Sequence, residues 1–174
     1  MKHILLIGFK NVGKTVIGKR LAEELSRKFV DLDTEIEKRE GMTAREIITK
    51  EGEMYFRNVE GEVLKKTIRE KESIVLALGG GAAMAPENQG VIQEHTVVLI
   101  TGPKEVLFER IMKKGRPAIF EKGLSDRDAF EKLYAMREPV YERLATMKIE
   151  NTGTVEEAVG KITELLNDKN SLTE

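Results

Sequence analysis

The sequence predicts an α/β protein, a three-layer α/β/α sandwich with a five-stranded parallel sheet as its middle layer. Two observations predict this fold class. Apolar runs rich in β-branched residues, such as SIVLAL at 73–78 and TVVLI at 96–100, are typical of strands buried on both faces. Segments of helical length separate the runs, and a chain that alternates strands with helices forms a parallel sheet with right-handed crossovers.

The elements follow in chain order from periodicity and from start signals. Strands are expected at 4–7, 28–33, 73–78, 96–100 and 148–150. Helices are expected at 16–25, 34–40, 52–69 and 104–113, and others begin near 43, 86, 125 and 154. Thr-x-x-Glu capping boxes support the starts at Thr43 and Thr154, and a first-turn proline supports the start at Pro86. Between 113 and 124 the helical pattern fails, which predicts a loop long enough to close over a ligand.

Length and composition bound the organisation of the chain. With 174 residues and 40% hydrophobic composition, one domain over residues 1–167 is expected, followed by a frayed tail at 168–174. Lys and Arg number 29 and Asp and Glu 30, so neither nucleic acid nor an anionic membrane is an expected partner. The absence of cysteine excludes disulfides and Cys-based sites. No signal peptide or membrane span is recognisable, and we expect a cytoplasmic monomer.

A glycine-rich segment follows the first predicted strand. Gly8, four residues, then Gly13-Lys14-Thr15 satisfy the phosphate-loop pattern. Glycines let successive backbone N–H groups point at an anion, and the next helix adds its positive end. Lys14 would neutralise the β- and γ-phosphates, and Thr15 would offer a hydroxyl to Mg²⁺. A chance match is the alternative, but the strand before and the helix after favour nucleotide binding.

Two acidic residues end the second predicted strand. Because strand side chains alternate, Asp31 and Asp33 are expected on one face, with Leu32 on the other. Ligands bind beyond the carboxyl ends of strands in such sheets, which indicates a functional role. The alternative is that one of the two caps the helix at 34–40, and both roles can coexist.

A run of glycines ends the third predicted strand. Gly79-Gly80-Gly81 would let a ligand approach main-chain amides closely, although a flexible turn is the alternative. Arg57, within a predicted helix, reads on its own as a solvated charge.

Together these motifs resemble the shikimate kinase family. They are the phosphate loop, Asp31-x-Asp33, Gly52-x-x-x-Phe56-Arg57-x-x-Glu60, Gly79-Gly80-Gly81, Arg116-Pro117 and Arg137-x-x-x-Tyr141, and the resemblance covers about residues 4–165. It implies a P-loop NTPase fold of the nucleoside monophosphate kinase type. It also implies a mobile lid at about 113–124 and acceptor-binding helices at about 34–69.

The resemblance further implies ATP-dependent phosphorylation of the 3-hydroxyl of shikimate, a step towards chorismate and the aromatic amino acids. Asp33, Lys14 and Arg116 would be catalytic, with Asp33 as base or orienter of the hydroxyl. Arg57 and Arg137 would grip the substrate carboxylate beside the three glycines, and Thr15 and Asp31 would hold Mg²⁺. The implied nucleotide-binding residues are Gly8, Asn11, Val12, Gly13, Lys14, Thr15, Val16, Arg110 and Arg116.

Two other functions remain open at this point. A gluconate-type kinase of the same architecture would also bind a carboxylate and hydroxyls through arginines. A catalytically silent ATP-binding module is the second alternative, although such a module needs no acceptor-site arginines.

Overall fold

The computed structural model describes residues 2–171, and five strands in that range form one sheet. The strands are β1 (Ile4–Ile7), β2 (Lys28–Asp31), β3 (Ile74–Ala77), β4 (Thr96–Thr101) and β5 (Met147–Glu150), in the spatial order β2-β3-β1-β4-β5. Every neighbouring pair is parallel, so the carboxyl ends of the strands meet at one edge of the sheet. The predicted five-stranded parallel sheet is confirmed.

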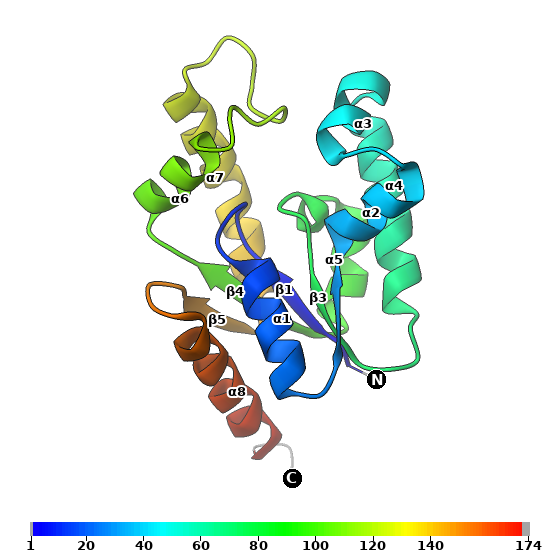
Figure 1. The fold of residues 1–174 in the computed structure, drawn as a ribbon, viewed down its shortest axis with the longest axis vertical. Helices are drawn as coiled ribbons and strands as arrows, with labels where there is room; N and C mark the ends of the chain where they lie inside the picture. Colours follow the sequence, from blue (N-terminus) through cyan, green and yellow to red (C-terminus); the bar gives the residue numbers. More distant parts are fainter. Residues whose placement is uncertain (1, 172–174) are drawn as a thin grey trace.

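Helices form the two outer layers of the sandwich. They are α1 (Lys14–Glu24), α2 (Leu32–Glu40), α3 (Ala44–Glu51), α4 (Glu53–Ile68), the 3₁₀ turn η1 (Ala82–Met84), α5 (Pro86–Gln93), α6 (Lys104–Met112), α7 (Asp126–Leu144) and α8 (Val155–Ser171). Helices α1 and α8 pack together on one face of the sheet, and α5 and α7 lie against β4 on the other (Figure 1). The three-layer arrangement is therefore as the sequence predicts.

The core lies on both faces of the sheet because the central strands are apolar throughout. All residues of β1 and β3 are buried. Leu21 of α1 and Ile162 of α8 are fully buried against one face. On the other face, the ring of Phe130 in α7 packs edge to face on Phe9, with 5.4 Å between the ring centroids. This packing fixes the loops that follow the strands.

Two groups of elements rise beyond the carboxyl edge of the sheet. Helices α2, α3 and α4 pack on one another on one side (Figure 1). On the other side stands α6, followed by a loop over residues 113–125 that leads into α7. Irregular backbone in this segment agrees with the loss of periodicity in the sequence.

Helix starts and ends follow local chemistry. Both predicted capping boxes form: Thr43 with Glu46, and Thr154 with Glu157. Pro86 occupies the first turn of α5. Helix α8 continues to Ser171, so the predicted tail at 168–174 is helical over its first four residues. Residues 172–174 lie outside the described residues. Between residues 2 and 171 no helix has the length and apolarity needed to cross a bilayer.

The expected placement of Asp33 on a strand is wrong. Strand β2 ends at Asp31, and Asp33 lies in the first turn of α2. The reason is local: Asp31 is the N-cap of α2, and its carboxylate accepts hydrogen bonds from the backbone N–H groups of Asp33 and Thr34. The capping alternative is therefore confirmed for Asp31.

Candidate active site

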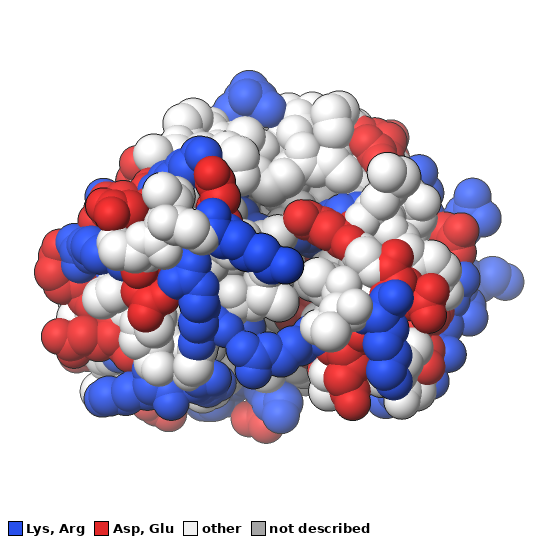
Figure 2. All heavy atoms as spheres, turned by 90° about the horizontal axis from the view of Figure 1, so that it is seen from above, with Lys and Arg blue, Asp and Glu red and all other residues white. Residues whose placement is uncertain are grey.

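A cleft of about 690 Å³ opens at the carboxyl edge of the sheet. This volume lies within the roughly 300–1,000 Å³ usual for small-molecule sites. Seen from above, the cleft is a hollow bordered on one side by Lys and Arg side chains (Figure 2). Most of the predicted site residues line it: Asn11, Gly13, Lys14, Thr15, Val16, Asp31, Asp33, Arg57, Gly79, Gly80, Gly81, Arg110 and Arg137.

The phosphate loop between β1 and α1 forms the floor of the cleft. Gly8 and Gly13 have φ angles of 139° and 107°, at which a residue with a side chain would be strained. A Cβ on Gly8 would also collide with the carbonyl of Ile100. Asn11 also has a positive φ, 63°, which asparagine tolerates. The loop is thus curled as an anion-binding loop must be.

Two asparagine side chains tie this loop to its surroundings. The Asn11 amide donates to the Arg110 carbonyl at the end of α6, over 3.3 Å. The Asn151 amide donates to the Val12 carbonyl over 2.8 Å. Asn151 follows β5 and was not predicted, because its partner lies far away in the sequence. The loop conformation is therefore held from both sides.

Lys14 brings a desolvated cation to the loop. Its ammonium donates to the carbonyl oxygens of Gly8 and Phe9, at 2.8 and 2.9 Å. Burial lowers the pKa of Lys14 to about 8, and the carboxylate of Asp33 partly offsets the effect. Carbonyl dipoles compensate an ammonium less than a full negative charge does, so this position favours an anionic ligand.

Thr15 and Asp31 present oxygen atoms beside the loop. The Thr15 hydroxyl donates to Asp31 Oδ2 over 2.7 Å, while Asp31 Oδ1 caps α2. A hydroxyl and a carboxylate are hard oxygen donors, and Mg²⁺ in nucleotide sites needs only one or two of them besides phosphate and water. Within residues 2–171 no group of three His, Asp or Glu side chains forms a metal cage. The pair therefore fits a nucleotide-bound Mg²⁺.

Asp33 faces the cleft from the first turn of α2. Desolvation raises the pKa of this carboxyl, the charge on Asp31 raises it further, and Lys14 and Lys10 oppose the rise. A Cβ on Gly79 would lie 2.6 Å from Asp33 Oδ1 and 2.9 Å from Glu60 Oε1. Gly79 therefore leaves the space in which two carboxylates approach the main chain.

Arg57 on α4 has carboxylate partners of its own. Its guanidinium pairs with Glu60 at 2.7 Å and with Glu53 at 3.3 Å. Glu60 is 1% exposed, and burial raises the pKa of its carboxyl while Arg57 opposes that rise. The i,i+3 spacing on one helix was visible in the sequence, so the Glu60 contact could have been predicted.

Arg137 on α7 is the opposite case. It is 5% exposed, its Nε has no hydrogen-bond partner, and no carboxylate forms an ion pair with it within residues 2–171. Its guanidinium lies over the Phe9 ring, 5.6 Å from the centroid, and burial lowers the pKa of Arg137. A buried, unpaired cation is unfavourable, so a ligand carboxylate would complete it.

The three glycines after β3 bring these side chains together. A Cβ on Gly80 would lie 3.0 Å from Arg137 Nη1, and one on Gly81 would collide with the Arg57 guanidinium. Both predicted carboxylate-binding arginines therefore flank one short stretch of main chain. A flexible turn, the alternative reading of the three glycines, does not require such close approaches.

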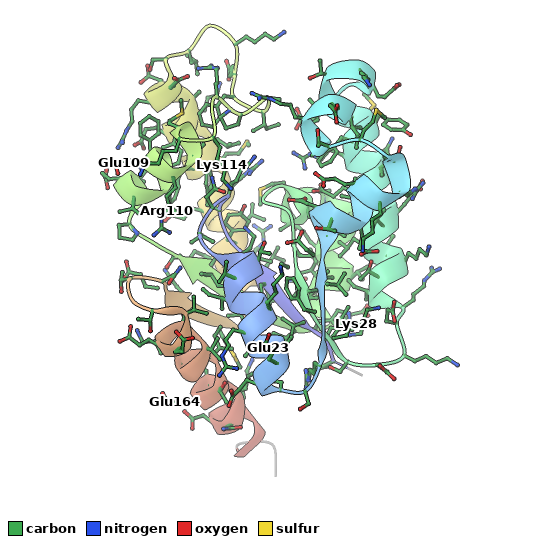
Figure 3. All side chains as sticks on the ribbon, viewed as in Figure 1. Glu23, Lys28, Glu109, Arg110, Lys114 and Glu164 are labelled. Atoms are coloured by element: carbon green, nitrogen blue, oxygen red, sulfur yellow. The ribbon has the colours of Figure 1, made fainter. Side chains whose placement is uncertain are left out.

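Arg116 lies away from the other predicted catalytic residues. Its guanidinium pairs with Asp126 and donates to the carbonyls of Glu121 and Leu124, at 2.8 and 3.2 Å. It does not line the cleft, in contrast to Arg110 at the end of α6 beside the phosphate loop (Figure 3). The structure therefore unites Lys14 and Asp33 in the cleft, but not Arg116.

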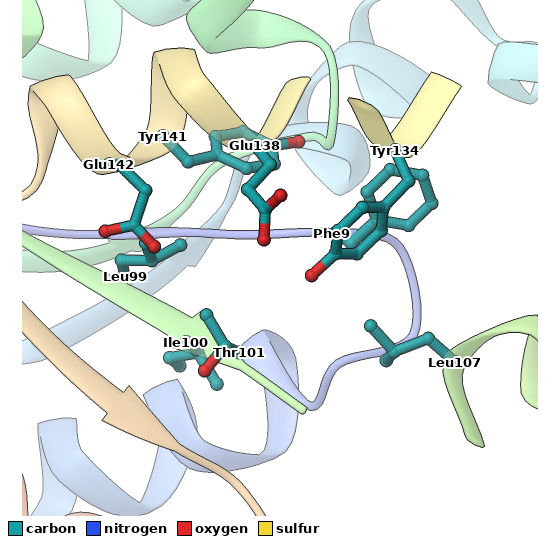
Figure 4. Close-up of a pocket in the computed structure, with 9 residues that line it drawn as sticks. All are labelled: Phe9, Leu99, Ile100, Thr101, Leu107, Tyr134, Glu138, Tyr141 and Glu142. Carbon is teal, nitrogen blue, oxygen red and sulfur yellow. The ribbon is translucent and has the colours of Figure 1, made fainter. Parts of the chain in front are cut away.

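A second cavity lies under the phosphate loop. It measures about 20 Å³ between β4, Phe9 and α7, and the carboxylate of Glu138 points into it beside Tyr134 (Figure 4). Roughly 10–15 Å³ is needed to hold one water molecule, so this cavity cannot take a nucleotide or an acceptor.

Comparisons with known proteins agree with the site. A family model described as shikimate kinase matches residues 10–167. A protein of that name from Pelotomaculum thermopropionicum is 38% identical over 174 residues, 98% of this chain and 98% of that protein. A bifunctional shikimate kinase/3-dehydroquinate synthase from Thermotoga maritima is 40% identical over 130 residues, 75% of this chain but 26% of that longer protein.

A solved structure shows the same fold. The chain resembles shikimate kinase from Acinetobacter baumannii in complex with shikimate, with a TM-score of 0.88 and 34% identity. The match covers 97% of this chain and 94% of that chain. The cleft, its arginines and the 113–125 loop all fall within residues matched by the family model.

Proposed function

The chain belongs to the shikimate kinase family, and from this membership we propose how its own residues carry out the reaction. The reaction is the ATP-dependent phosphorylation of the 3-hydroxyl of shikimate, which gives shikimate 3-phosphate on the route to chorismate and the aromatic amino acids. The full-length relatives favour this activity over a gluconate-type kinase and over a silent ATP-binding module.

Arg137 and Arg57 hold the carboxylate of shikimate. A planar guanidinium binds a carboxylate through two parallel hydrogen bonds, which fixes the orientation of the ring as well as its place. The supporting observation, and the one on which the proposal chiefly rests, is the buried Arg137 guanidinium without an ion-pair partner within the described range. Gly80 and Gly81 lie along the same carboxylate.

Asp33 accepts a hydrogen bond from the 3-hydroxyl and orients it towards the phosphoryl group. Its position opposite Gly79, between the two arginines and the phosphate loop, supports this role. The raised pKa makes the carboxylate of Asp33 a better proton acceptor than a solvated aspartate. The hydroxyl proton thus passes to Asp33 as the 3-oxygen forms its bond to the γ-phosphorus and the bond from that phosphorus to the departing oxygen of ADP breaks.

Lys14 and the loop amides bind the phosphates of ATP. The remaining nucleotide-binding residues are proposed as Gly8, Asn11, Val12, Gly13, Thr15, Val16 and Arg110, which form or border the same loop. Arg116 is proposed to reach the nucleotide from the lid. Thr15 and Asp31 would hold Mg²⁺, and the bound ion would neutralise charge on the transferring phosphate. Desolvation of Lys14 strengthens its contact with a phosphate oxygen.

The 113–124 segment is proposed as a mobile lid that carries Arg116. In this proposal the guanidinium leaves Asp126 and turns into the cleft when ATP binds. Its present partners are an exposed carboxylate and two carbonyls, and a phosphoryl group offers more negative charge. Closure excludes water, which would otherwise accept the phosphoryl group.

We also propose that residues 1–167 act as a single domain, as a monomer in the cytoplasm. The continuous core supports a single domain, and the near-neutral charge of −1 supports a protein with no nucleic-acid or membrane partner. Size-exclusion chromatography with light scattering tests the monomer.

A coupled assay tests the proposed roles. ADP release by purified protein with Mg²⁺ is followed without acceptor, with shikimate and with gluconate. Turnover that requires shikimate supports the proposal, and equal turnover with gluconate contradicts it. The variant Arg57→Ala is expected to raise KM for shikimate far more than KM for ATP. An unchanged KM for shikimate would remove Arg57 from the site.

A further inference from the structure

One hydrogen bond crosses the mouth of the cleft. Arg45 on α3 donates from Nη2 to the backbone carbonyl of Arg116, over 2.6 Å. The two residues stand 71 positions apart in the sequence. In Figure 1 the inner end of the 113–125 loop reaches towards α3, on the far side of the cleft from α6. The acceptor side of the molecule is thereby joined to the loop.

Arg45 is suited to this contact because capping and packing hold its helix in place. The capping box of Thr43 and Glu46 starts α3, Ile47 is fully buried, and α3 packs along α4. No carboxylate forms an ion pair with Arg45 within residues 2–171, whereas α4 holds Arg57 through two glutamates. The carbonyl of Arg116 is the hydrogen-bond acceptor of the Arg45 guanidinium.

The contact acts on the main chain of Arg116 and leaves its side chain independent. The Arg116 guanidinium is held by Asp126 and by carbonyls of its own loop. Arg45 therefore helps to fix the position of the Arg116 backbone, and Asp126 fixes the orientation of the Arg116 guanidinium. Close by, Ile119 of the loop and Ala44 and Ile48 of α3 line the cleft.

We propose that Arg45 is a positioning residue that holds the Arg116 peptide at the mouth of the cleft. This inference rests on the proposed function, in which Arg116 contacts the transferring phosphoryl group. Because α3 belongs to the acceptor-binding helices, the bond keeps the loop over the acceptor, so that the phosphoryl group passes to the hydroxyl and not to water. Without the bond, the loop closes less often and water enters the cleft.

The test compares Arg45→Ala, Arg45→Gln and Lys50→Ala in the whole chain. Lys50 lies on the same helix and is exposed, and its ammonium donates to the sulfur of Met42 over 3.5 Å. Two quantities are measured: kcat/KM for shikimate, and ADP formed per shikimate 3-phosphate formed. A guanidinium–carbonyl bond is strong enough for about a fivefold to tenfold effect.

For Arg45→Ala we expect kcat/KM for shikimate to fall about fivefold to tenfold and the ratio of ADP to phosphorylated product to rise above one. Glutamine is neutral but donates to a carbonyl, so Arg45→Gln should recover much of both losses. Lys50→Ala should match the wild type. Trypsin should also cut Arg45→Ala faster at Lys113, Lys114 and Lys122, a measurement that needs no turnover.

The proposal is overturned if Arg45→Ala and Lys50→Ala behave alike in coupling and in proteolysis. It is also overturned if Arg45→Gln is as impaired as Arg45→Ala, because loss of charge alone would then explain the effect. If the wild type does not phosphorylate shikimate at all, the proposed function fails. Proteolysis then still reports whether Arg45 holds the loop.

Discussion

Removing the charge of Arg137 and removing the charge of Arg57 should have different effects on the stability of the fold. Arg137 is 5% exposed with an unpartnered Nε, and the charge of Arg57 lies close enough to lower its pKa further. Arg137→Met therefore removes a buried cation that forms no ion pair within residues 2–171, so it breaks no ion pair there. Arg57→Met instead strands Glu60, which is 1% exposed.

The expected size of each change in stability follows from the contacts of the arginine that is replaced. Breaking a buried ion pair costs about 3–5 kcal/mol, and because Arg57 is partly exposed we expect Arg57→Met to lose about 3 kcal/mol of unfolding free energy. For a domain of this size that is roughly 6–12 °C in Tm. Arg137→Met should keep or raise Tm. Both variants lose a charge-assisted contact to shikimate, so KM for shikimate should rise about 30- to 100-fold in each.

Thermal unfolding and steady-state kinetics on the two variants measure both effects. Both variants replace an arginine with a methionine. The difference between their changes in Tm therefore reports the surroundings of each arginine. Equal losses of Tm would refute the reasoning about Arg137, and so would an unchanged KM for shikimate. A stable Arg57→Met would mean that Glu60 takes up a proton when its partner is removed, which a pH dependence of Tm would reveal.

Three further predictions concern single groups. Asp33→Asn should lower kcat by about 10²- to 10⁴-fold and leave the Kd for ATP within about twofold, measured by a fluorescent nucleotide; equal loss of ATP binding would contradict the role of Asp33. Asp31→Asn should raise the Mg²⁺ concentration needed for half-maximal activity. It should also lower Tm slightly, because Asp31 accepts hydrogen bonds through both oxygens and asparagine has only one acceptor oxygen. An unchanged Mg²⁺ requirement would exclude Asp31 from the metal site. Burial and the neighbouring His3 lower the pKa of His95, so the unfolded chain binds this proton more readily than the folded chain. The contribution of His95 to stability should therefore be complete above about pH 6.5 and be lost as the pH falls below it. His95→Gln should make Tm depend less on pH in that range.

The sheet and the phosphate loop were predictable because their signals are local. Continuous apolar runs such as Ile74–Ala77 determine buried strands, and the spacing of Gly8, Gly13 and Lys14 determines a curled loop. The end of β2 was mispredicted because strand alternation and helix capping compete at Asp31. There the carboxylate accepts two backbone hydrogen bonds, and the helix begins two residues earlier than expected, at Leu32.

Contacts between distant segments were not predictable. Asn151 supports the phosphate loop across 139 positions, and Arg45 reaches Arg116 across 71. Neither residue belongs to a motif, and both read in the sequence as ordinary polar side chains. The placement of Arg116 on Asp126 was equally hidden, since an Arg-Pro pair in a loop says nothing about side-chain direction.

The central claim is that one cleft holds shikimate by its carboxylate so that Asp33 faces the 3-hydroxyl. The position of the new phosphate ester tests it most directly. Purified protein is incubated with ATP, Mg²⁺ and shikimate, and the product is identified by phosphorus–proton correlation NMR. The account predicts a single ester whose phosphorus couples to the proton on carbon 3. An ester at another hydroxyl, or inorganic phosphate alone, would contradict it.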